Sequence, residues 1–225
     1  MNHGPLLFLG VFFAMATSWT GMVLTPWMQI GKQAAVTVES TGAIYPSARP
    51  GMASQGAEVY RANGCAACHS MQVRASDAAA NRWGPRVTVA QDYLYENPAM
   101  IGSQRIGPDL TNIGLRRPDA HDQLLHLYNP SLTMPDGQKS VMPPYPFLFE
   151  KRKLGEQPSP DALKLPAALA TPGYEIVPRH EALALVAYLQ SRMANTPLFE
   201  APMDLPKPAE GTNAPAGAAT NTPAK

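Results

Sequence analysis

The stretch Cys65-Ala66-Ala67-Cys68-His69 decides how the rest of this 225-residue chain is interpreted. It holds both cysteines of the chain, separated by two residues, and a histidine follows the second one. This C-x-x-C-H spacing is typical of covalent haem attachment, with two thioether bonds at the porphyrin edge and the histidine on the iron. We therefore predict one haem c, bound through Cys65 and Cys68, with His69 as its proximal ligand.

Two other chemistries use a C-x-x-C pair. A structural zinc site needs further cysteine or histidine ligands at a suitable spacing, and the chain has no second cysteine pair. A thioredoxin-like dithiol is expected within a βαβ pattern, which the sequence does not show. With no cysteines left for disulfides, the haem itself is expected to stabilise the fold.

The composition excludes some classes of partner and suggests many loops. The formal net charge is +1, so no strong field points to nucleic acid. Only 16% of residues are charged, and there are 24 prolines and 17 glycines. This composition favours a loop-rich domain with extended linkers over a regular bundle or sheet.

The N-terminus predicts a membrane anchor. The first 31 residues contain no Lys, Arg, Asp or Glu, and the apolar run from 5 to 24 has about the ~20 residues that a spanning helix needs. A cleaved signal peptide is the alternative, since Ala14-Met15-Ala16 resembles a cleavage site, but the charged n-region is missing. Trp19 and Trp27 suit an interfacial aromatic belt. We expect residues 1–31 to form an uncleaved anchor.

The rest of the chain divides into a linker, a domain and a tail. Residues 32–51 are expected to form a linker with a short strand at 34–38, and residues 52–195 the domain. Helices are predicted at 52–63, 118–128 and 178–194, with Met193 on the apolar face of the last, and loops between them, including 131–178. Residues 196–225 are rich in proline and alanine and are expected to be disordered. The predicted fold is all-α: a single N-terminal transmembrane helix followed by a loop-rich cytochrome c-like haem domain.

The sixth ligand of the iron decides between catalysis and electron transfer. We favour Met142, because Pro143 and Pro144 stiffen the backbone beside it. Met134, also followed by proline, is the rival, and Met100 is the third methionine. Methionine ligation raises the haem potential and leaves no open site for a substrate, so no catalytic residue is predicted. The remaining alternatives are histidines on predicted helices: His121, His126 and His180.

Other residues are candidates for holding the haem. The Pro108 carbonyl, in Gly107-Pro108-Asp109-Leu110, could accept the Nδ1–H of His69 and fix its orientation; an ordinary turn is the alternative. Guanidinium groups match the haem propionates, although each arginine could equally be a solvated surface residue. The candidates are Arg74, Arg82, Arg86 and Arg105, of which we select Arg74 and Arg105 for the site.

Residues 60–74 (YRANGCAACHSMQVR) resemble the haem segment of the mono-haem subunit, subunit II, of cbb3-type cytochrome c oxidases. Three later stretches match the family in the same order, at 82–84, 102–110 and 142–145. The resemblance implies a His69/Met142 axial pair and electron relay towards an integral haem–copper subunit that reduces oxygen in aerobic respiration. It also implies further cytochrome c subunits as partners, and a calcium ion at the interface near Ser103.

The chain departs from that family in several places. The family usually has an acidic residue before the proline after the membrane helix, where residues 21–26 read GMVLTP. The insertion at 151–171, the terminal helix and the tail are also unusual.

Two alternatives for the parent complex remain. Residues 60–65 and the closing helix also suit the haem c subunit of a cytochrome c-dependent nitric oxide reductase, whereas the 102–110 block favours the oxidase. A free-standing anchored cytochrome c shuttle is the other alternative. Small residues along the anchor favour packing against a partner helix. Because haem c is attached after export, we expect the bacterial inner membrane, with the haem domain on the periplasmic side. A haem-based sensor or peroxidase would need an open sixth site.

Overall fold

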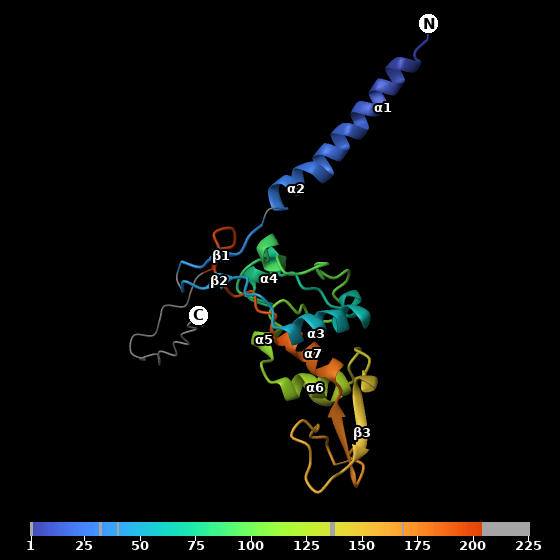
Figure 1. Ribbon diagram of the computed structural model, residues 1–225, viewed down its shortest axis with the longest axis vertical. Helices are drawn as coiled ribbons and strands as arrows, with labels where there is room; N and C mark the ends of the chain where they lie inside the picture. The colour runs from blue at the N-terminus through green and yellow to red at the C-terminus, as the bar shows by residue number, and fades with distance from the viewer. Residues whose placement is uncertain (1, 32, 40, 136–137, 168, 204–225) are drawn as a thin grey trace, which may run out of the picture.

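A long N-terminal helix leads the chain into a helical domain (Figure 1). The computed structural model describes residues 2–31, 33–39, 41–135, 138–167 and 169–203. The leading helix runs over Gly4–Ile30 and consists of α1 (Gly4–Trp19), a π-helical turn η1 (Thr20–Leu24) and α2 (Thr25–Ile30). The π turn precedes Pro26, which has no N–H to donate to the preceding turn. By length and composition this helix could span a membrane, as predicted for the N-terminus.

The linker after the helix forms a small sheet. Strand β1 (Val36–Thr37) pairs antiparallel with β2 (Ile44–Tyr45), and β1 lies within the predicted strand at 34–38. Arg86 ties this segment to the domain: its guanidinium donates to both carboxylate oxygens of Asp92 and to the Tyr45 hydroxyl. The Tyr45 hydroxyl in turn donates to Asp92 at 2.6 Å, so the linker is held against the domain by hydrogen bonds to a buried ion pair.

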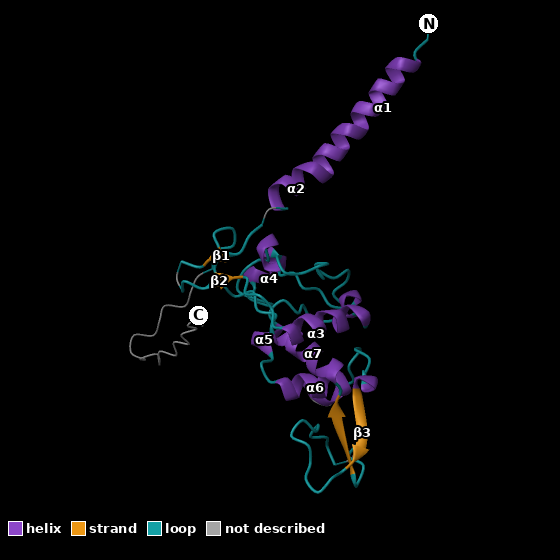
Figure 2. Ribbon diagram, viewed as in Figure 1, coloured by secondary structure: helices purple, strands orange, loops and turns teal. Residues whose placement is uncertain are grey.

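Three main helices form the domain, close to the predicted positions (Figure 2). They are α3 (Gly51–Ala62), α6 (Ala120–Tyr128) and α7 (His180–Gln190). Asp119 caps α6 by accepting from the His121 N–H. Short helical turns fill the remaining segments: η2 (Cys65–Ala67), α4 (Ala75–Ala79), η3 (Ala90–Tyr93), α5 (Ile113–Arg116), η4 (Pro130–Thr133) and η6 (Pro146–Leu148).

The core is built on the crossing of α3 and α7. At Gly56 a Cβ atom would lie 1.8 Å from the Ala184 carbonyl oxygen, so only glycine lets the two backbones approach this closely. The Tyr60 and Tyr188 rings pack beside the crossing with centroids 5.5 Å apart. Apolar side chains from α5, α6 and the haem segment complete the core, among them Met71, Ile113 and Leu124.

The structure corrects the prediction of an all-α fold. Besides the β1–β2 pair, a second two-stranded sheet joins β3 (Phe149–Lys153) to β4 (Tyr174–Pro178), with Phe149 opposite Pro178. It lies within the segment predicted to be mostly loop. All of β3 after Phe149 is exposed, so its sequence FEKRK lacks the alternation of apolar and polar residues by which a half-buried strand is predicted. This hairpin extends from the end of the domain opposite the N-terminal helix (Figure 1).

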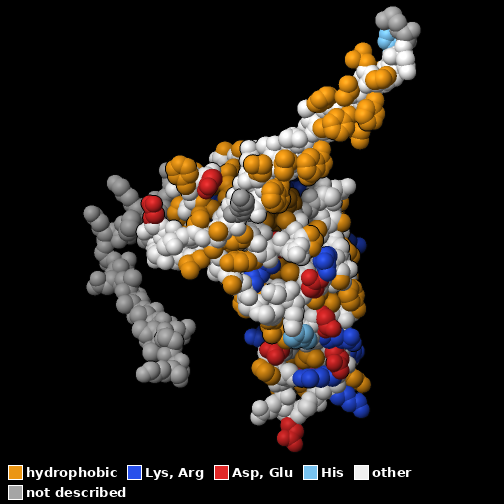
Figure 3. Space-filling view, turned by 45° about the horizontal axis from the view of Figure 1, so that its top comes forward, with side chains coloured by type: hydrophobic (Ala, Val, Ile, Leu, Met, Phe, Trp, Pro, Cys, Tyr) orange, Lys and Arg blue, Asp and Glu red, His pale blue; other side chains and the backbone are white. Residues whose placement is uncertain are grey.

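The prediction for Met193 is wrong. Helix α7 ends at Gln190, so Met193 is outside the helix and 46% exposed rather than part of the core. At the start of the tail expected over 196–225, Leu198 and Ala201 are buried and form a β-bridge. Residues 204–225 lie outside the described residues. Hydrophobic side chains gather along the N-terminal helix, and charged ones near the hairpin end (Figure 3).

Candidate haem site

The C-x-x-C-H segment begins where α3 ends. Gly64 adopts a left-handed conformation with φ of 66°, which stops the helix and starts the turn η2. Within this turn the His69 N–H donates to the Cys65 carbonyl at 3.0 Å. Neither cysteine is part of a disulfide, and burial raises the pKa of the Cys65 thiol to about 11. The turn therefore places the two cysteines and the histidine together at the end of a core helix.

The His69 ring is held by a segment almost forty residues later. Its Nδ1 lies 2.8 Å from the Pro108 carbonyl oxygen, which can only accept, so Nδ1 carries the proton and Nε2 is left for a metal. Gly107 packs on the same ring: a Cβ there would lie 2.4 Å from His69 Cε1. Burial lowers the pKa of His69, partly offset by the bond to Pro108. The bond to Pro108 thus orients the ring.

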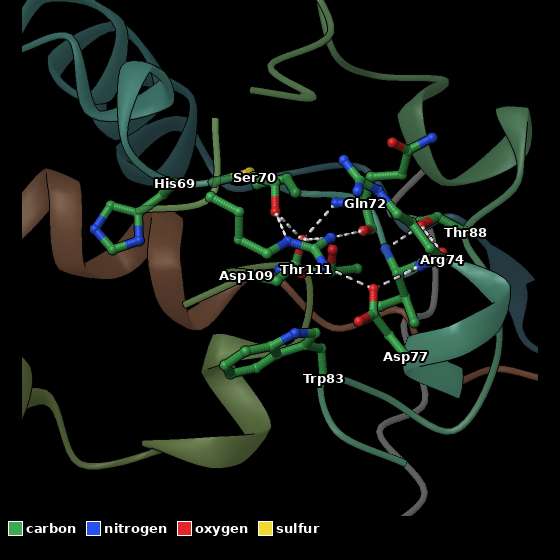
Figure 4. A network of polar contacts seen from close by, with 12 residues as sticks. His69, Ser70, Gln72, Arg74, Asp77, Trp83, Thr88, Asp109 and Thr111 are labelled. Atoms are coloured by element: carbon green, nitrogen blue, oxygen red, sulfur yellow. Dashed lines mark hydrogen bonds and ion pairs between the residues drawn. The ribbon is translucent and has the colours of Figure 1, made fainter. Parts of the chain in front are cut away.

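Beside this ring lies a polar network around Asp109 (Figure 4). The Asp109 side chain is fully buried and accepts from the Ser70 hydroxyl at 2.7 Å and from the Gln72 N–H at 2.8 Å. Arg105 donates to Ser70 Oγ, to Asp77 and to the Gln72 carbonyl. Sequence reasoning did not select Asp77 or Asp109; the position of Asp109 directly after Pro108 was the available signal.

The four arginine candidates lie in different surroundings. Arg105 directs all three of its guanidinium nitrogens to protein groups. Arg86 forms a buried ion pair with Asp92, and 1% of each side chain is exposed. Arg82 stacks over the Trp83 ring at 4.9 Å. Arg74 is exposed. The structure therefore brings Arg105 to the haem segment as a support and leaves Arg74 and Arg82 at the surface.

The methionines separate into core residues and two available ones. Met71 is buried, with its sulfur 3.4 Å from the Tyr188 hydroxyl, and Met100 belongs to the core. Met142 is half-buried against that core, and its N–H donates to Ser140 Oγ at 3.1 Å. Met134 is also half-buried. The histidines on helices have protein partners of their own: His121 with Lys164, His126 with Thr133, and His180 with Gln55.

These donors suit an iron porphyrin attached through C-x-x-C-H. Two cysteines outside any disulfide and an imidazole that presents Nε2 are the groups that such a haem takes, and a thioether is the common sixth ligand. Among the described residues no cluster of three or more His, Cys, Asp or Glu side chains could hold a metal ion. The residues present therefore fit the predicted cofactor.

These features together are those of an anchored cytochrome. A C-x-x-C-H turn follows one of two crossed core helices, its histidine is oriented by a hydrogen bond, and an apolar helix begins the chain. A family model described as "Cytochrome C oxidase, mono-heme subunit/FixO" matches residues 3–173, well over half of the chain. The chain belongs to this family, which confirms the resemblance seen in the sequence. It is thus a mono-haem oxidase subunit that acts in electron transfer within a complex of oxidase subunits. No curated protein matches it.

Proposed function

We propose that this chain is the haem c subunit of a cbb3-type oxidase and relays single electrons towards the haem–copper subunit that reduces oxygen. The observation that carries the proposal is the His69 Nδ1···Pro108 bond in a C-x-x-C-H turn, within a chain of the mono-haem subunit family. A bound haem supplies a one-electron couple. The chain supplies thioether bonds at Cys65 and Cys68, and the Nε2 of His69.

The surroundings of the histidine support electron transfer rather than catalysis. The Pro108 carbonyl holds the imidazole in one tautomer, so the ligand need not reorient when the iron changes charge. Arg105 would act on the cofactor by holding Ser70 and Asp77 in place, and exposed Arg74 remains the candidate for a propionate contact.

Met142 is our proposed sixth ligand. Its loop is fixed on both sides, because the Ser140 N–H donates to Ser131 Oγ and the Tyr145 N–H donates to the Leu127 carbonyl. Met142→His should keep the iron low-spin and lower its potential, since a thioether favours ferrous iron more than imidazole does. Met142→Ala should open the iron to carbon monoxide, and Met134→Ala should not. The reverse pattern in carbon monoxide difference spectra would assign the ligand to Met134.

The location follows from the chemistry of attachment. We place the uncleaved helix Gly4–Ile30 in the bacterial inner membrane and the haem domain on the periplasmic side, where haem c is attached. Partners would be the haem–copper subunit and further cytochrome c subunits. A calcium ion near the exposed Ser103, at the interface with the catalytic subunit, would need ligands from that partner.

Two measurements on the full chain test the proposal. Haem should stay with the polypeptide after acid and organic solvent, and Cys65→Ala with Cys68→Ala should release it. Mild detergent should co-purify a many-helix subunit that consumes oxygen. Freely extractable haem contradicts covalent attachment, while isolation with a subunit that reduces only nitric oxide, or as a lone monomer, contradicts the oxidase assignment.

A further inference from the structure

The buried carboxylate of Asp109 joins the two segments that meet at His69. One segment, residues 70–72, follows the haem motif, and the other, residues 107–111, carries the Pro108 carbonyl. Asp109 Oδ2 accepts from the Ser70 hydroxyl at 2.7 Å and from the Gln72 N–H at 2.8 Å, while Oδ1 accepts from the Thr111 N–H at 2.9 Å. None of its side chain is exposed. A single carboxylate therefore fixes the separation of the two segments.

Main-chain bonds bracket the same point. The Gly107 N–H donates to the Cys68 carbonyl at 2.9 Å, and the Leu110 N–H donates to the Ser70 carbonyl at 2.8 Å. Pro108 lies between these two bonds, so its carbonyl has little freedom of its own. Arg116 also donates to the main-chain carbonyl of Asp109.

We infer that Asp109 is a positioning residue that sets the haem potential by fixing the bond from His69 Nδ1 to Pro108. This rests on the proposed function, in which His69 binds the iron. A strong bond at Nδ1 makes the imidazole more basic and favours ferric iron, so loosening the bond raises the potential. Among the described residues no hydrogen bond joins Asp109 to the His69 ring, so we assign its effect on position to residues 107–111.

Charge must be separated from position, because removing a buried anion also raises the potential. Asp109→Glu keeps the charge but moves the carboxylate by one methylene at a fully buried position, so it tests position alone. Arg105 also lies 3.4 Å from Asp109 Oδ2, so Asp109 and Asp77 share this cation. Asp77→Asn is therefore the matched control for charge: Asp77 pairs with Arg105 at 2.7 Å, and no hydrogen bond joins its side chain to residues 107–111. Ser70→Ala removes one of the bonds to Asp109, together with the bond from Arg105 Nε to Ser70 Oγ, and keeps the Asp109 carboxylate.

The experiment is a redox titration of the full-length chain, with haem attached, in its detergent-solubilised complex. Asp109→Asn and Asp109→Glu should each raise the haem potential. We expect a tenfold change in the reduction equilibrium constant, which corresponds to about 59 mV for a one-electron couple. Ser70→Ala should shift it in the same direction by less, and Asp77→Asn should change the equilibrium less than twofold.

An unchanged potential in Asp109→Glu, or an equal shift in Asp77→Asn, would overturn the inference. If the Asp109 variants do not accumulate, Ser70→Ala decides, and an unshifted potential there also overturns it. A parent chain without covalent haem would instead contradict the proposed function, so the two failures are distinguishable.

Discussion

Replacing Arg86 by Met should destabilise the protein strongly without changing its haem chemistry. Arg86 and Asp92 each have 1% of their side chain exposed and are joined by bonds of 2.7 and 3.0 Å. Arg86 also donates to the Thr196 carbonyl at 2.6 Å and to the Tyr45 hydroxyl at 3.3 Å, so it connects the linker to the C-terminal segment. Methionine fills similar volume but leaves the carboxylate without its cation.

The size of the stability loss in Arg86→Met follows from the burial of the ion pair. Breaking a buried pair costs about 3–5 kcal/mol, because the remaining charge stays out of water. For a chain of this size each kcal/mol lowers Tm by about 2–4 °C, which predicts a loss of about 6–20 °C. The control is Arg61→Met, because Arg61 pairs with Glu58 at the surface, with 53% and 61% of the side chains exposed. Such pairs contribute about 0–1 kcal/mol.

Thermal unfolding followed at the haem absorbance measures both variants, and a redox titration follows the site. Arg86→Met should lower Tm and leave the potential as in the parent, since its donors contact protein groups. Equal Tm values for Arg86→Met and Arg61→Met would refute the role of the buried pair. A large change in potential with unchanged Tm would return Arg86 to the group of propionate ligands.

Two further predictions concern the core and the response to acid. Gly56→Ala should lower the free energy of unfolding by about 1–3 kcal/mol or more, because its Cβ would overlap the Ala184 carbonyl. Gly51→Ala in the same helix meets open space and should be neutral or mildly stabilising. Chemical denaturation compares the two variants, and equal free energies of unfolding would contradict the close helix crossing. Burial lowers the pKa of His126 from its ordinary 6.5 to about 4, with Arg117 as the next cause. The folded state therefore binds fewer protons in that interval, so stability should fall by at most about 3 kcal/mol as pH drops from 6.5 to 4, and His126→Gln should remove this dependence; an unchanged slope would assign it to other groups.

Local patterns in the sequence were enough to predict several parts of the protein. The spacing of Cys65, Cys68 and His69 lies within one turn, and a haem motif requires no distant residue to be recognised. The uncharged run before residue 32 predicted a helix able to span a membrane, because hydropathy is a sum over neighbours. Helices α3, α6 and α7 followed from caps and apolar spacing, which are also local.

Contacts between distant segments were decided only by the tertiary structure. The β3–β4 hairpin pairs Phe149 with Pro178 through main-chain groups, which leave no apolar pattern in an exposed strand. Arg86 was indistinguishable from a surface arginine until Asp92 and the Thr196 carbonyl, 110 residues later, were placed around it. Asp109 became a support for His69 because folding buried its carboxylate between residues 70–72 and 111. The sequence by itself predicted the ligand chemistry through local spacing, and folding determined what surrounds those residues, because burial and pairing depend on which distant segments meet.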